Sequence, residues 1–198
     1  TALEGQFQAQ EQAARLIAVL ATISLTMIFL VLYSRYRSVV LTAIIMGNIP
    51  LALVGSVLAL WISGQPLSVA ALVGFITLTG IATRNGILKI SHYINLCALE
   101  GEQFGQPMIV RGSLERLTPV LMTALITALG MIPLLFATGP GSEIQKPLAI
   151  VVTGGLVSST LLTLLLLPLI FERWGALGSL AEVWAHIRNP QAEDRSAS

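Results

Sequence analysis

The sequence predicts an all-α integral membrane protein with five transmembrane helices. Three observations predict this class: 55% of the 198 residues are hydrophobic, only 11% are charged, and the mean hydropathy is +0.82. A soluble domain carries about 25% charged residues, more than twice this share. The composition therefore excludes an ordinary soluble enzyme, an acidic disordered chain and, with a net charge of only +1, a basic nucleic-acid binder.

Five apolar stretches justify the helices in turn, because a spanning helix needs about 20 mostly apolar residues. The predicted spans cover about residues 16–33, 38–62, 67–96, 117–138 and 147–171. The first is too long for a signal peptide, and the residues before it lack the positive charge of one. Only the third contains charged residues, Arg84 and Lys89.

The distribution of Lys and Arg in the connecting segments predicts the orientation. Seven lie on the side of the C-terminus and two on the other side; they are Arg35, Arg37, Arg111, Arg116, Arg173, Arg188 and Arg195 against Arg15 and Lys146. The N-terminus is therefore expected outside and the C-terminus inside. Residues 1–13 become an outer lead-in, 14–173 the transmembrane domain, and 174–198 a cytoplasmic tail that is partly disordered.

The start of the chain favours a larger context. The sequence begins with Thr1 and a polar stretch that leads directly into a span entering from outside. We therefore expect the C-terminal piece of a longer protein or a truncated gene product. The alternative is a small five-span protein that its own spans translocate.

The third span carries a cation near the middle of the membrane. In a helix from Leu67 to Gly101, Arg84 lies about 25 Å from either end, too far to reach the interface by snorkelling. Helical periodicity puts Arg84 on one polar stripe with Thr77, Gly80, Ser91 and Asn95. Gly80 lies one turn before Arg84, where it allows a neighbouring helix to approach.

A second polar cluster on this helix is turned by about 100° from the first. It comprises Asn85, Lys89 and His92. Lys89 and His92 lie nearer the inner end of the span, so snorkelling to the inner interface is the expected behaviour of both.

The fourth span repeats the pattern of a cation followed by hydroxyls. Arg116 enters from inside, and Thr123, Thr127 and Gly130 follow on the same face. Hydroxyls at this spacing can pass a proton, hold water or bond back to backbone carbonyls. Helix packing accounts for the two threonines equally well.

The carboxylate partner of Arg84 is absent from the predicted spans, which contain no Asp or Glu. A buried arginine stays protonated, so we expect its compensating carboxylate to come from outside this chain. A carboxylate beside Arg84 would be poised to exchange protons, which predicts an ion-coupling site. No phosphate loop, HExxH sequence or Ser/His/Asp constellation is present, so the sequence predicts no enzyme, no cofactor and no metal site of its own.

Two motifs resemble the resistance–nodulation–division (RND) efflux permeases: the run Gly80–Leu88 and the run Arg116–Thr123. The stretch Gly139–Phe171 is closer to the heavy-metal efflux branch of these permeases. The resemblance covers roughly Glu4 to Trp174, which would be the last five spans of a twelve-span bundle.

The resemblance implies a proton-driven secondary transporter in the inner membrane of Gram-negative bacteria, exporting heavy-metal cations by metal/proton antiport. It also implies partners: the N-terminal half of the same permease, a homotrimer, a periplasmic adaptor and an outer-membrane channel. Arg84 matches the tenth-span cation that pairs with acidic proton carriers, with Asn85 directly after it, and Arg116 and Thr123 match polar residues of the eleventh span. Two alternatives remain: a drug or lipid exporter of the same superfamily, and a non-transporting truncated or accessory membrane protein.

Overall fold

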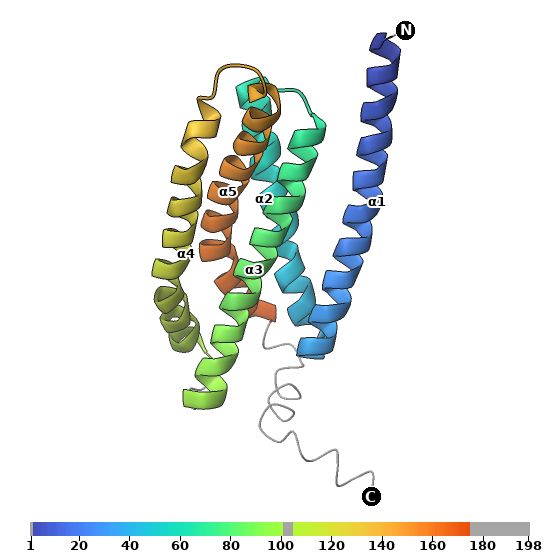
Figure 1. Cartoon of the computed structure of the whole chain (residues 1–198). Coiled ribbons are helices and arrows are strands. Elements are labelled where there is room, and N and C mark those ends of the chain that lie inside the picture. The colour runs from blue at the N-terminus through green and yellow to red at the C-terminus, as the bar shows by residue number, and fades with distance from the viewer. Residues whose placement is uncertain (1, 101–104, 175–198) are drawn as a thin grey trace, which may run out of the picture.

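Five long helices make up the described part of the chain. The computed structural model describes residues 2–100 and 105–174 (Figure 1). The helices are α1 (Ala2–Tyr36), α2 (Val39–Ser63), α3 (Val69–Glu100), α4 (Gln106–Leu135) and α5 (Ser142–Trp174). Each is long and apolar enough to cross a membrane. The predicted all-α class with five helices of membrane-spanning length and composition is confirmed, whereas the proposed tail beyond Trp174 lies outside the described residues.

Helices α1, α4 and α5 begin before the predicted spans, because hydropathy detects only the apolar part of a helix, whereas α4 ends at Leu135, three residues before the predicted end. Helix α1 begins at Ala2 and so includes most of the lead-in 1–13. Helix α4 begins at Gln106, with Pro107 in its first turn, where the missing N–H costs no helical hydrogen bond. Helix α2 starts after Ser38, whose hydroxyl accepts a hydrogen bond from the Leu41 amide, and ends before Gly64 at φ 65°.

Helices α2, α3 and α5 form the densest part of the bundle, with α5 packed against both of the others (Figure 1). Small residues allow α2 and α5 to approach closely. A Cβ on Gly55 would overlap Ser158, and one on Gly154 would overlap Ala59. Close approach through small residues is the usual way in which membrane helices gain packing energy.

Helix α1 stands apart from the bundle except near its C-terminal end (Figure 1). Leu32 and Tyr36 are its buried residues within the described part, and the Tyr36 hydroxyl lies 2.7 Å from Oγ of Ser91 in α3. Most of the other described α1 side chains are exposed. One end of α1 is therefore anchored, and the rest presents an apolar surface.

Candidate ion-coupling site

Arg84 lies at the midpoint of α3 and faces away from the rest of the chain. It is 15 residues from Val69 and 16 from Glu100, or about 23 Å from either end at 1.5 Å per residue. Its side chain is exposed. The structure therefore places this cation deep within a span, on a surface that the described residues leave uncovered.

Most of the polar stripe predicted around Arg84 shares this outward surface. Thr77, Gly80 and Asn95 are exposed, whereas Ser91 is partly covered by Tyr36 of α1. A Cβ on Gly80 would meet no atom of the described chain within 4 Å. Any helix that packs on Gly80 must therefore come from beyond the described residues.

The predicted face of α4 has its hydroxyls bonded to its own backbone. Oγ1 of Thr123 donates to the Pro119 carbonyl at 2.8 Å, and Oγ1 of Thr127 donates to the Thr123 carbonyl at 2.8 Å. Arg116 is half-buried, and Gly130, like Gly80, faces open space. Of the three roles considered for these hydroxyls, the structure shows the bond to the backbone.

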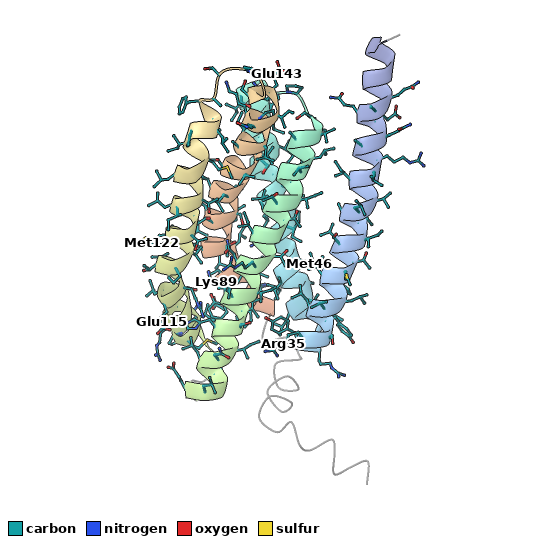
Figure 2. All side chains as sticks on the ribbon, in the orientation of Figure 1. Arg35, Met46, Lys89, Glu115, Met122 and Glu143 are labelled. Atoms are coloured by element: carbon teal, nitrogen blue, oxygen red, sulfur yellow. The ribbon has the colours of Figure 1, made fainter. Side chains whose placement is uncertain are left out.

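Lys89 is the buried cation of the bundle, and the expectation that it snorkels to the inner interface is wrong. Its side chain is only 1% exposed, and Nζ donates a 2.8 Å hydrogen bond to the Thr163 carbonyl of α5 (Figure 2). The physical reason is helical register. Lys89 continues the buried face of Leu78 and Ala82, which packs against α2 and α5, so its amine meets a helix before it can reach water.

Two further residues join Lys89 in a buried polar cluster that the sequence analysis missed. Oγ1 of Thr163 donates to Oδ1 of Asn48 at 2.8 Å, and Nδ2 of Asn48 donates to the Ala82 carbonyl at 3.1 Å. Asn85 is also buried, one turn before Lys89. Asn48 could have indicated such a cluster from the sequence, because an amide in the middle of an otherwise apolar span requires hydrogen-bond partners.

The other polar cluster links α3 to α4 near the end of the bundle at which α3 ends and α4 begins. Nε2 of His92 lies 2.8 Å from Oε2 of Glu115, and Nε of Arg111 lies 2.9 Å from Oε1 of the same carboxylate. Figure 2 shows Glu115 near the same end of the bundle as Arg35, with Glu143 at the opposite end. His92 is therefore tied to the neighbouring helix and is part of an exposed ionic cluster.

Carboxylates lie far from Arg84 along the helices. In α2 through α5 they are Glu100 at the end of α3, Glu115 in the first third of α4, and Glu143 and Glu172 near the two ends of α5. Across residues 2–100 and 105–174, no three His, Cys, Asp or Glu side chains gather into a group that could hold a metal ion. The described chain therefore supplies the cation of a coupling site but neither its carboxylate nor a metal centre.

Comparisons with known proteins agree with the motifs. The family model described as the AcrB/AcrD/AcrF family matches residues 1–173. The cobalt-zinc-cadmium resistance protein CzcA of Cupriavidus metallidurans is 40% identical over 190 residues, covering 96% of this chain and 17% of CzcA. The nickel and cobalt resistance protein CnrA of the same organism is 43% identical over 164 residues, covering 83% of this chain and 15% of CnrA.

A crystal structure of a heavy metal efflux pump matches the fold with a TM-score of 0.71 at 41% identity, over 84% of this chain and 16% of the pump. This chain thus spans about a sixth of the length of the proteins that it resembles. The match of the family model over most of the chain settles the family. The chain belongs to the AcrB/AcrD/AcrF family, the RND permeases.

Proposed function

We propose that this chain is the C-terminal transmembrane portion of a proton-driven pump that exports heavy-metal cations by metal/proton antiport. The observation that carries the proposal is the position of Arg84, halfway along α3 and facing outward. A charged side chain at the centre of a membrane helix costs about 2.5–3.5 kcal/mol on insertion scales. Such a residue is retained where a partner or a wet cavity compensates for that cost.

A carboxylate from another part of the permease is the partner that fits Arg84. When it is ionised, the guanidinium forms a charge-assisted pair with it. When it takes up a proton, the pair loses its charge complementarity and the two helices are free to separate. Proton uptake and release would thereby change the packing of α3 against its neighbour, which is the basis of antiport.

The other candidate residues have supporting roles in this proposal. Asn85 follows Arg84 and provides a polar side chain on the buried flank of the site. Arg116, Thr123 and Thr127 form the polar face of α4 that borders the path of the proton. Gly80 and Gly130 are the points at which helices of the N-terminal half would approach, since both face open space in this chain.

The names of the relatives favour divalent metal cations as substrates, because CzcA is a cobalt-zinc-cadmium resistance protein and CnrA a nickel and cobalt resistance protein. The pump would be a homotrimer in the bacterial inner membrane, with a twelve-span bundle in each subunit. It would work with a periplasmic adaptor and an outer-membrane channel. The N-terminus of this chain would lie in the periplasm and its C-terminus in the cytoplasm.

To test the proposal, the full permease that contains this chain is expressed in a bacterial strain without metal efflux of its own. Resistance to cobalt, zinc and cadmium is measured for the wild type, for Arg84→Ala and for Arg84→Lys, with protein levels checked by immunoblot. Arg15→Ala, in the outer part of α1, is the control for loss of an exposed arginine. Proteoliposomes with a pH-sensitive dye inside report proton movement on addition of each metal.

We expect Arg84→Ala to abolish resistance and metal-dependent proton movement at normal protein levels. Arg84→Lys should retain part of both, because the charge remains while the planar fork of donors is lost. This chain expressed alone should insert but confer no resistance. Full export by Arg84→Ala would refute the coupling role, and resistance to drugs without resistance to metals would favour the drug-exporter alternative.

A further inference from the structure

The buried polar cluster forms a chain of hydrogen bonds that begins and ends on α3. It starts at the Ala82 carbonyl, which accepts from Asn48 of α2, and passes from Asn48 to the hydroxyl of Thr163 in α5. It returns from the Thr163 carbonyl to the amine of Lys89. Helix α3 is therefore held at two points by the helices behind it.

The two points of attachment lie on one face of α3, and Arg84 lies on the other. Ala82 and Lys89 are seven residues apart, which separates them by about 10 Å along the axis and by only about 20° around it. Arg84 is turned from them by about 140° to 160°. Two anchors on the same line resist both rotation and tilting of the helix that carries Arg84.

Burial makes these bonds resistant to breakage. The exposed fractions are 3% for Asn48, 1% for Lys89 and 0% for Thr163. A polar group that loses its partner in such a site finds no water to replace it, which makes the loss of the bond costly. Rotation of α3 about its axis would break at least one of these hydrogen bonds, so the bonds favour one rotation of the helix.

Burial of a hydroxyl in α5 does not by itself produce such bonds. Oγ of Ser159 and Oγ1 of Thr160 are buried and have no hydrogen-bond partner in the described structure. Thr160 lies one turn before Thr163 and is 5% exposed. The bonds of Thr163 are therefore specific to its position, and Thr160 is a matched residue without them.

We propose that Asn48, Lys89 and Thr163 form a frame that positions Arg84 for proton coupling by fixing the rotation of α3. This inference rests on the coupling role proposed above for Arg84. The frame residues do not touch the carboxylate partner, because they lie behind the helix. They act by fixing the position of the Arg84 side chain. A misplacement of about 1 Å at a reacting group can lower the rate of a reaction by about 100-fold.

Thr163→Val is the decisive variant, made in the full permease and assayed in proteoliposomes. Valine keeps the shape and the main-chain carbonyl, so the bond from Lys89 remains and only the link to Asn48 is lost. Thr163→Ser restores a hydroxyl, and Thr160→Val removes a hydroxyl that has no partner. The rate of metal-driven proton movement is measured from pH 5.5 to 8.5 at saturating metal and again at low metal.

Thr163→Val should lower the maximal rate by about tenfold, leave the metal concentration for half-maximal rate unchanged, and move the pH profile upward by up to about one unit. The shift arises because a displaced Arg84 stabilises the ionised carboxylate less, so the carboxylate holds its proton to higher pH. Thr163→Ser should recover most of the rate and the original profile. Thr160→Val should match the wild type.

Other titratable groups do not face the frame. Helix α2 has no charged residue. None of the charged side chains described in the remaining helices is buried. The charged residues of these helices are Glu4, Glu11, Arg15 and Arg35 in α1, Arg111, Glu115 and Arg116 in α4, and Glu143, Lys146, Glu172 and Arg173 in α5. All of them are unchanged in these variants, as is the ionic cluster of His92 with Glu115 and Arg111.

Lys89→Met is an independent test of the frame, because it removes the hydrogen bond from Lys89 to the Thr163 carbonyl while keeping a long side chain. It should show the same lower rate and the same shift as Thr163→Val. If Arg84→Ala abolishes transport but Thr163→Val and Lys89→Met behave like Thr160→Val, the frame is refuted and the coupling role stands. If Arg84→Ala transports normally, the proposed function itself fails.

Discussion

The amine of Lys89 in α3 donates a 2.8 Å hydrogen bond to the main-chain oxygen of Thr163 in α5, at a site that is 1% exposed. Four residues of sequence separate this inward cation from the outward one, Arg84. One helix therefore carries two cations with opposite surroundings. Lys89 contributes to packing within the chain, and Arg84 is available to a partner outside it.

Two replacements of Lys89 should separate the contribution of its packing to stability from the contribution of its charge. Lys89→Ala should lower the free energy of unfolding by about 2 kcal/mol or more, because it leaves a cavity in a fully buried site. Lys89→Met fills the same space without a charge to desolvate, so its stability should lie within about 1 kcal/mol of the wild type or above it. Thermal melting of the detergent-solubilised protein measures both. Equal losses of melting temperature for Lys89→Met and Lys89→Ala, relative to the wild type, would show that the charge, and not the packing, stabilises this site.

The close approach of α2 and α5 predicts a large effect of a single methyl group. Gly55→Ala places a Cβ against the Cβ of Ser158 and the Gly154 carbonyl, neither of which is the end of a flexible side chain. We expect a loss of about 1–3 kcal/mol. Gly47→Ala in the same helix is the control, because its Cβ would meet nothing within 4 Å. It should be neutral or slightly stabilising, since alanine favours the helix. Equal melting temperatures for the two variants would contradict the packing seen here.

Removal of the Thr123 hydroxyl should reduce export by a few-fold and not abolish it, because water can replace one hydroxyl along a proton path. Thr22→Ala is a matched control: Thr22 of α1 is exposed and donates the same kind of bond, at 2.8 Å, to the carbonyl four residues earlier. Export should be unaffected in Thr22→Ala. Growth on graded metal concentrations measures both, and unchanged growth of Thr123→Ala would remove Thr123 from the coupling site.

The orientation is open to a direct test. A reporter fused to the C-terminus should show cytoplasmic activity, and one inserted in the connection at residues 136–141 should show periplasmic activity, because seven of nine connecting cations lie on the first side. Paired enzyme reporters that are active on only one side of the membrane make the measurement. The reverse pattern would invert the proposed topology.

The number and identity of the helices were predictable, because apolar stretches of 18 to 30 residues separated by charged or turn-forming segments have few alternatives. The environment of single polar residues was harder to predict. Hydropathy treats Arg84 and Lys89 alike, and only the packing of α2 and α5 against the face of Ala82 and Leu78 shows that Lys89 faces inward. Asn48 and Thr163 were missed because their bond joins positions 115 residues apart, and a single sequence does not reveal which distant faces meet.

The contact between Gly55 and Ser158 also sets an order of assembly during synthesis. These residues are separated by 103 positions in the chain, so at about 5–20 residues per second the ribosome needs roughly 5 to 20 s to deliver the second after the first. During that interval α2 is in the membrane with Asn48 and Ser56 still without the partners that α5 brings. Insertion of α5 thus completes the hydrogen bonds of α2, and a nascent chain stalled before α5 would leave those polar groups open to quality control.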